Sequence, residues 1–294
     1  MHLKIRDMIY LRKPAFLFIL FICYSTFIGA DESWRDQMKD LIYSPRYFGP
    51  NALPIPELRS GRIDTRWEAE VRGEYHHYQG DKTKDLYARL FIPIANGLAG
   101  VELYGVIKED YKMTEETRKE RHAVETKPPI GCRGDFIFSA FYQVLRNEKW
   151  CDIMVAANIK TASGNRVCDA RYTDAAAYWF DASFGRNLYQ NADKTATIRM
   201  QMMAGFYCWM TNDLVHRQND AFLYGIGASG HYKAASLSVD YSGFHGYKNN
   251  GDSPMALRTK LNIEYKKNIL SFRFKHGMKD NLYDSYSIGY IRCF

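Results

Sequence analysis

The sequence of 294 residues lacks the motifs that mark several large classes of protein. Its mean hydropathy of −0.41 is too low for a protein built from many membrane-spanning helices. The six cysteines form no Cys-x-x-Cys pair and no cluster with histidine. The sequence therefore predicts no metal site and no cofactor. It also contains no Gly-x-Ser-x-Gly motif, so we expect a protein that is not an enzyme.

Low-complexity stretches, internal repeats and long flexible linkers are absent as well. The chain contains 22 Tyr, 17 Phe and 5 Trp, which amount to 15% aromatic residues. An intrinsically disordered chain has far fewer aromatic residues, so disorder is excluded. An aromatic excess on a polar average is unusual for a soluble enzyme and needs a structural explanation.

Residues 1–30 have the composition of a secretory signal peptide. Four basic residues between Lys4 and Lys13 precede an almost unbroken apolar run over 15–29, and Ala30 is followed by polar residues. This order predicts export and cleavage after Ala30, with a retained single-span anchor as the alternative. Cleavage would lower the formal net charge of +7. Nucleic acid is therefore not an expected partner.

Residues 31–64 contain a cluster of prolines: Pro45, Pro50, Pro54 and Pro56. Proline interrupts both helices and sheet ladders, so we predict an irregular segment, preceded by a short helix over 32–41. The apolar residues of this segment need cover. Two placements remain open: a plug inside the following domain, or a periplasmic segment that binds a partner membrane or periplasmic protein.

From residue 65 onward, apolar and polar residues alternate with a period of two. Residues 66–75 alternate without a break: Trp67, Ala69 and Val71 lie on one face, and charged residues occupy the other. Strict alternation of this length predicts β-strands. The pattern predicts twelve strands, over 65–78, 85–95, 100–111, 134–145, 151–162, 175–185, 195–210, 220–230, 234–244, 256–265, 269–277 and 283–294.

The connections between these strands differ in length. The second and third strands are joined at Asn96 and Gly97, a tight-turn signature. Longer polar connections, such as 112–133 and 163–174, follow the odd-numbered strands. Short turns at one end and longer loops at the other are typical of an antiparallel up-and-down transmembrane β-barrel. The long connection near 186–194 departs from this rule.

Two features indicate that the apolar face points outward to lipid. The apolar faces are rich in Ala, Gly and single aliphatic residues, which fill a protein core poorly but suit a lipid environment. Aromatic residues such as Trp67, Tyr104, Trp150 and Tyr265 lie near strand ends. Amphipathic rings are favoured at both membrane interfaces. Outer-membrane lipid is therefore an expected partner.

The last strand carries a further signal in Tyr286, Ile288, Tyr290 and the terminal Phe294. This ending resembles the C-terminal strand of Gram-negative outer-membrane β-barrel proteins, although Arg292 stands where an apolar residue is usual. The resemblance implies export through the periplasm to the cell outer membrane. It also implies that the barrel assembly machinery recognises these four residues during biogenesis.

The charged faces of a barrel with lipid outside must line its lumen. The predicted lumen residues are Arg66, Glu68, Glu70, Arg72, Glu74, Arg89, Glu102, Lys108, Asp135, Asp152, Lys160, Arg199, Asp240, Arg258, Lys260, Glu264, Arg273 and Lys275. The acidic row on the first strand could face the basic residues of the last strands, since these strands meet at closure.

These features predict a narrow diffusion channel for small polar solutes, or a barrel whose interior is plugged. Two alternatives remain open: a non-conducting accessory subunit of an outer-membrane complex, and an outer-membrane lipid hydrolase. Of the cysteines, Cys132 and Cys168 lie in loops predicted on the same side of the barrel. This pair is the expected disulfide.

Overall fold

The computed structural model describes residues 43–123, 130–209 and 220–294. The chain divides into two compact units, Met1–Lys39 and Asp40–Phe294, and the described residues all belong to the second. The predicted signal peptide and the helix over 32–41 lie outside these residues. No helix among the described residues is long and apolar enough to cross a membrane.

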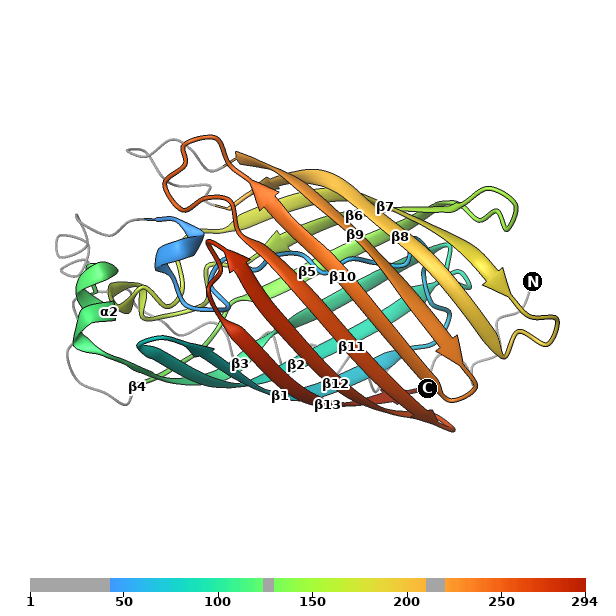
Figure 1. Ribbon diagram of the computed structural model, residues 1–294, viewed down its shortest axis with the longest axis horizontal. Coiled ribbons are helices and arrows are strands. Elements are labelled where there is room, and N and C mark those ends of the chain that lie inside the picture. Colours follow the sequence, from blue (N-terminus) through green and yellow to red (C-terminus); the bar gives the residue numbers. More distant parts are fainter. Residues whose placement is uncertain (1–42, 124–129, 210–219) are drawn as a thin grey trace, which may run out of the picture. The chain divides into compact units, whose positions relative to one another are not determined.

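One antiparallel sheet of 13 strands makes up the described unit (Figure 1). Its strands are β1 (Glu68–Tyr78), β2 (Asp81–Ile94), β3 (Ala99–Met113), β4 (Ile130–Cys132), β5 (Phe136–Leu145), β6 (Asp152–Lys160), β7 (Ala177–Gln190), β8 (Ala196–Cys208), β9 (Asp220–Tyr232), β10 (Ala235–His245), β11 (Met255–Tyr265), β12 (Asn268–Lys279) and β13 (Asp284–Cys293).

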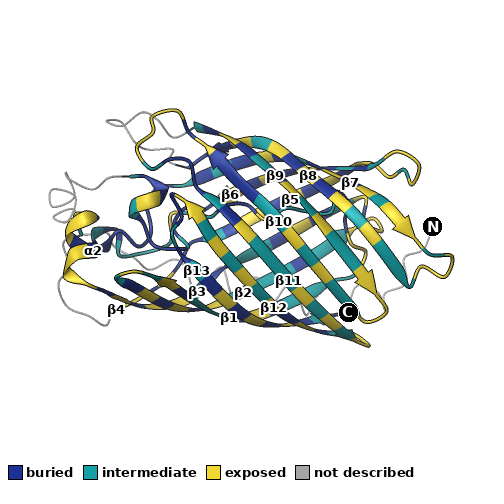
Figure 2. Ribbon diagram, in the orientation of Figure 1, coloured by how far each residue is buried: buried dark blue, intermediate teal, exposed yellow. Residues whose placement is uncertain are grey.

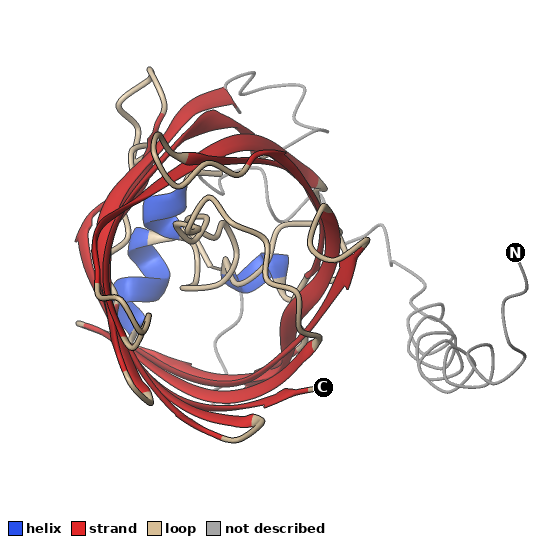
Figure 3. Cartoon of the chain, turned by 90° about the vertical axis from the view of Figure 1, so that its right-hand side faces the viewer, coloured by secondary structure: helices blue, strands red, loops and turns tan. Residues whose placement is uncertain are grey.

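All strands except β4 close into a barrel, seen end-on in Figure 3. The first and last strands pair from Glu68 opposite Cys293 to His77 opposite Asp284, and β2 pairs with β3. Closure leaves no unpaired edge among these twelve strands, as a hydrocarbon environment requires. Each of the twelve predicted strands has one counterpart, so the predicted twelve-strand barrel is confirmed.

The additional elements are short and belong to connections. Strand β4 adds three residues to β3, and helix α2 (Glu115–Glu120) begins after Thr114, whose side chain caps it. Two 3-10 helices, η2 (Pro45–Tyr47) and η3 (Val167–Asp169), complete the structure. Segments of three to six residues carry no measurable period, which explains why alternation did not predict them.

The two ends of the barrel differ as the connection lengths predicted. We call the end that carries α2, β4 and η3 the loop end, and the opposite end the turn end. The turn at 95–98 begins with Ala95 and Asn96, both at positive φ, 50° and 55°. This left-handed backbone matches the twist of a hairpin. The connection near 186–194 is shorter than expected because β7 continues to Gln190.

The outer face of the barrel is apolar and exposed. Along the strands, exposed and buried residues alternate, which gives the banded pattern in Figure 2. Val71, Ile226, Leu237 and Ile288 are between 44% and 61% exposed. An apolar surface this continuous is unfavourable in water and favourable in lipid.

A charge on this outer face should therefore destabilise the barrel. Ile226 lies at the middle of β9 and is 44% exposed. We expect Ile226→Arg to cost about 2–4 kcal/mol, the usual penalty for arginine at the bilayer midplane. Equilibrium unfolding by urea from lipid vesicles measures this cost.

The control for this prediction is Ser238→Arg, because Ser238 lines the interior cavity. The added arginine would there face water and should cost much less. Equal destabilisation by the two variants would contradict the assignment of the outer face to lipid.

Candidate functional site: the barrel lumen

The segment of residues 43–64, which we call the lumenal thread, runs inside the barrel from the loop end to the turn end (Figures 1 and 3). Near the loop end, Gly49 N donates to Ala170 O at 2.8 Å. Near the turn end, Arg146 Nη2 donates to Ile63 O at 2.8 Å. The thread therefore spans the length of the lumen, and at residue 68 the chain enters β1.

Arginines of the barrel wall bind the main-chain carbonyls of the thread. Arg258 Nη2 donates to Ile55 O at 2.6 Å, and the Arg199 guanidinium donates twice to Ser60 O, at 2.9 and 2.7 Å. A proline-rich segment has no strand partner, so its carbonyls need other donors when they are enclosed. The wall supplies them with positively charged groups, which form stronger hydrogen bonds than neutral donors.

Side chains of the thread also pair with charges of the wall. Arg59 Nη2 lies 2.6 Å from Glu102 Oε2, and Glu57 Oε1 lies 3.2 Å from Arg273 Nη1. At the turn end, Arg62 Nε lies 3.0 Å from Asp152 Oδ2. These contacts join the thread to β3 and β6 on one part of the wall and to β12 on another.

The structure places most of the predicted lumen residues on the inner face or at its two rims. Those that line the interior cavity are Glu68, Arg72, Glu74, Arg89, Glu102, Asp135, Lys160, Arg199, Asp240, Arg258, Lys260, Arg273 and Lys275. Glu70 and Asp152 are buried within the wall. Arg66 and Glu264 pair with each other at 2.5 Å, at the turn end.

The prediction for Lys108 is wrong, because Lys108 points outward. Its side chain is 66% exposed and pairs with the exposed Asp110. The cause is an irregularity in the β2–β3 ladder, where Leu86 pairs with Lys108 but Tyr87 pairs with Val106. The extra residue, Ile107, reverses the facing of every residue after it. Glu109 therefore points inward in place of Lys108.

The acidic row on β1 meets the basic residues of β12 at one point. Arg273 Nη2 lies 2.8 Å from Glu70 Oε1. The same oxygen of Glu70 also lies 3.0 Å from Arg72 Nη1. Glu68 Oε2 lies 2.8 Å from Arg89 Nη1. Most of the acidic residues are therefore neutralised by arginines of β1 and β2 rather than by the last strands.

A cavity of about 850 Å³ lies beside the thread in the lumen, and it is lined by the thread and by strands all around the wall. On strands β8 to β11 the lining includes uncharged polar side chains: Gln201, Ser229, Ser236, Ser238, Thr259 and Asn262. Lys260 and Lys275 also line it. Within the part of the chain that the structure describes, neither ammonium group has a carboxylate within 4.0 Å.

A buried charge cluster closes part of the loop end. Asp81 Oδ2 accepts from Arg171 Nη1 at 2.6 Å, Arg121 Nη1 at 2.8 Å and the Tyr283 hydroxyl at 2.6 Å. Arg171 also binds Glu109 Oε1 at 2.6 Å. All of these side chains are almost fully buried. The cluster joins three loops to the rim of the barrel.

The opposite charges of this cluster stabilise one another in their ionised forms. Burial by itself would lower the pKa of the Arg171 guanidinium, but Asp81 and Glu109 raise that pKa well above its usual value. The same balance, with Tyr283 and Asp81 as partners, raises the pKa of Arg121. Both guanidinium groups therefore stay charged while they are buried.

The predicted disulfide does not form. All five described cysteines are thiols, and Cys132 Sγ donates a hydrogen bond to Glu109 Oε1 at 3.4 Å. Cys132 is buried in β4, whereas Cys168 lies in η3. Burial raises the pKa of the Cys132 thiol, and the carboxylate of Glu109 adds to this effect. Cys132 is therefore an unreactive thiol.

Several charged residues of the lumen and its loop end were missed from the sequence. Arg59 and Glu57 lie in the thread, and Arg121 and Arg171 lie in long loops. None of these segments has a period that assigns a face to its residues. His76 continues the alternation of β1, which was the one available signal that it points inward.

Comparison with known proteins supports the fold. No protein-family model matches the sequence, and no curated protein matches it either. An outer-membrane channel from Pseudomonas putida F1 superposes with a TM-score of 0.53 at 11% identity, over 83% of this chain and 97% of that chain.

Two further structures are similar at lower scores. The KdgM porin in complex with disordered oligogalacturonate has a TM-score of 0.47 at 11% identity, over 77% of this chain and 99% of that chain. The translocator domain of the autotransporter NalP from Neisseria meningitidis has a TM-score of 0.46 at 8% identity, over 81% and 90%. With its closed barrel and its likeness to the Pseudomonas channel, the chain has the fold of the outer-membrane β-barrel proteins.

Proposed function

We propose that the protein is a narrow diffusion channel of the outer membrane for small polar solutes, and that the lumenal thread sets its width. The observation that carries this proposal is the cavity of about 850 Å³ beside the thread, which charged, uncharged polar and apolar side chains line together inside a closed barrel. A barrel whose interior is packed only for stability would fill this space with side chains.

The charges on the cavity wall favour anionic solutes. Lys260 and Lys275 face the cavity without a carboxylate partner among the described residues, whereas Glu102 and Asp240 are paired with arginines. Unpaired positive charges in a narrow space raise the local concentration of anions. Serine, threonine and asparagine on the same wall supply neutral hydrogen-bonding groups for the rest of a solute.

Biogenesis and orientation form part of the proposal. We place the protein in the outer membrane, reached through the periplasm, with the turn end on the periplasmic side as in other outer-membrane barrels. Tyr286, Ile288, Tyr290 and Phe294 all lie outward and are 50% to 64% exposed. They are available to the assembly machinery and then to lipid.

Arg292, which stands where an apolar residue is usual in this strand, donates a hydrogen bond to Asn268 Oδ1 at 2.7 Å.

The proposal needs no partner protein to cover the thread. Phe48, Ala52, Leu53 and Ile55 are at most 6% exposed, because the barrel encloses them. His76 and Ser285, which contact each other at 2.7 Å, are both buried on the inner side, so this histidine–serine pair could not act on lipid at the outer face.

Single-channel recording from planar bilayers tests the proposal. We expect small, steady conductance steps with a preference for anions over cations in a potassium chloride gradient. A folded barrel that shows no conductance, with the thread or without it, would exclude a channel and would favour the accessory-subunit alternative.

The two lysines of the cavity provide the selectivity test. We expect the double variant Lys260→Glu, Lys275→Glu to shift the reversal potential from the anion side toward the cation side, because four units of charge change inside a narrow lumen. The matched control is Lys279→Glu, at the exposed end of β12. Equal shifts by both variants would show that the cavity does not determine selectivity.

A further inference from the structure

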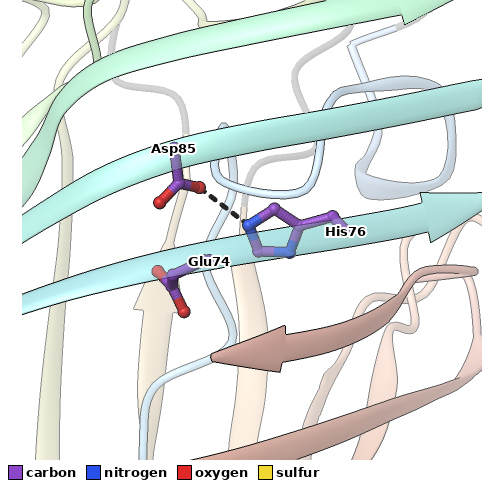
Figure 4. A group of neighbouring side chains, drawn as sticks. All are labelled: Glu74, His76 and Asp85. Carbon is purple, nitrogen blue, oxygen red and sulfur yellow. Dashed lines mark hydrogen bonds and ion pairs between the residues drawn. The ribbon is translucent and has the colours of Figure 1, made fainter. Parts of the chain in front are cut away.

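On the lumen wall near the loop end, Glu74, His76 and Asp85 bring three potential metal ligands together (Figure 4). Glu74 and His76 are two residues apart on β1 and share its inner face, and Asp85 of β2 lies directly opposite Glu74. One ligand atom from each lies within 4.8 Å of the others. The register of two paired strands is therefore what assembles the group.

One oxygen of this group has no partner. Asp85 Oδ2 accepts from Asn51 Nδ2 at 2.7 Å and contacts His76 Nε2 at 2.7 Å. Asp85 Oδ1 is buried and has no hydrogen-bond partner among the described residues. Figure 4 shows this oxygen on the side of Asp85 that faces the Glu74 carboxylate. A buried carboxylate oxygen without a donor is costly, and a cation relieves that cost.

The ring of His76 is held in a suitable orientation by a residue outside the group. His76 Nδ1 contacts Ser285 Oγ at 2.7 Å, and the imidazole is 2% exposed. When a metal is bound, the proton would lie on Nδ1 and be donated to Ser285, which leaves the lone pair of Nε2 for the metal in place of the contact with Asp85. Histidines that bind metals commonly donate their other ring N–H to such an oxygen, which fixes the tautomer.

The surrounding charges permit a divalent cation. Arg72 binds Glu74 through contacts of 3.1 and 3.3 Å. With a neutral His76, the formal charges of Glu74, Asp85 and Arg72 sum to one negative charge. Asn51 of the thread spans Asp85 and Glu109, with a second contact of 2.9 Å. The site therefore lies where the thread meets the wall.

We propose that Glu74, His76 and Asp85 form a binding site for a divalent transition metal such as Zn²⁺. One nitrogen and two carboxylate oxygens are a ligand set that Zn²⁺ accepts, with bonds of about 2.0–2.2 Å. A metal at the centre separates His76 Nε2 from Asp85 Oδ2, which are now 2.7 Å apart, and binds the Glu74 carboxylate. It replaces the direct contact between His76 and Asp85 and takes up the unpartnered oxygen.

Metal binding to the folded, detergent-solubilised protein tests the site. After treatment with EDTA, we expect isothermal titration calorimetry to show one equivalent of Zn²⁺ bound. His76→Gln and Asp85→Asn should each lower the affinity at least tenfold. Ser285→Ala removes only the hydroxyl group that orients the imidazole of His76, and it should weaken Zn²⁺ binding by about tenfold.

The matched control is His276→Gln. His276 Nδ1 lies 2.7 Å from Asp284 Oδ1, but this pair is 52% and 39% exposed and lacks a third ligand. This variant should bind Zn²⁺ as the wild type does. Unchanged binding by His76→Gln and Asp85→Asn, or loss of binding in His276→Gln instead, would overturn the proposal.

A second measurement needs only the wild-type protein, in case the variants do not fold. X-ray absorption spectroscopy at the zinc edge should show one imidazole nitrogen and carboxylate oxygens around the bound Zn²⁺. A zinc spectrum without an imidazole nitrogen, or an absence of Zn²⁺ binding by the folded wild type, would overturn the site. Neither measurement depends on whether the barrel conducts.

Discussion

Deletion of residues 31–57 should raise the single-channel conductance of the barrel severalfold. The deletion removes the thread from the loop end as far as Glu57, including the carbonyl bound by Arg258 and the carboxylate of Glu57, and only residues 58–64 stay in the lumen. The freed volume adds to a cavity that already measures about 850 Å³. Because conductance rises with the cross-section of the narrowest part, the removal of a peptide chain from the lumen has a large effect.

The barrel should survive this deletion, because the wall keeps its own ion pairs. Arg258 retains Asp240 at 3.2 Å, and Arg273 retains Glu70 at 2.8 Å. Residues 58–64 remain, so Arg59 still binds Glu102. Heat-modifiable mobility on a gel verifies that the shortened protein is folded.

A shorter deletion, of residues 31–42, is the matched control for this experiment. It leaves every described contact of the thread in place, so the conductance should stay that of the full-length protein. If both deletions gave the same conductance as the intact chain, the thread would not limit the path, and its role would be structural.

The second large effect is expected at the loop end, where Arg171→Ala should strongly destabilise the protein. Arg171 is fully buried and contacts both Asp81 and Glu109 at 2.6 Å. Its removal leaves Asp81 with Arg121 and Tyr283, but among the described residues no other cation pairs with Glu109. Removal of one partner of a buried ion pair costs about 3–5 kcal/mol, because the remaining charge stays enclosed.

The temperature at which heat-modifiable mobility is lost measures this destabilisation. Arg133→Ala is the matched control, because Arg133 lies in an exposed position at the same end of the barrel. An Arg171→Ala protein as stable as the control would show that the loops are held by other contacts.

The sequence was sufficient to predict the barrel wall because each strand carries its own alternating pattern. Lumen residues such as Arg72 and Lys260 follow from the same pattern. The pattern fails where the backbone itself is irregular: nothing in the residues around Ile107 shows that an extra residue enters β3, and Lys108 was therefore placed on the wrong face.

The contents of the lumen could not be predicted in this way. The prolines showed that residues 43–57 are irregular and need cover, but both a plug and a periplasmic segment satisfied that requirement. Only the three-dimensional contacts show that the thread binds Arg199 and Arg258, which are more than a hundred residues away in sequence. The ion pair between Asp81 and Arg171 likewise joins a strand to a loop that has no periodic pattern.

The direction of the thread limits the order in which this protein can fold. The chain leaves the thread at the turn end and continues directly into β1, whose pairing with β13 seals the wall. Its earlier residues lie at the loop end, beside Ala170 and Gly251. Either the wall closes around a segment that is already in place, or the leading part of the chain is drawn through a finished pore. Two of the arginines that bind thread carbonyls, Arg199 and Arg258, belong to β8 and β11. On the first route, the thread therefore gains these contacts only when the later strands join the wall.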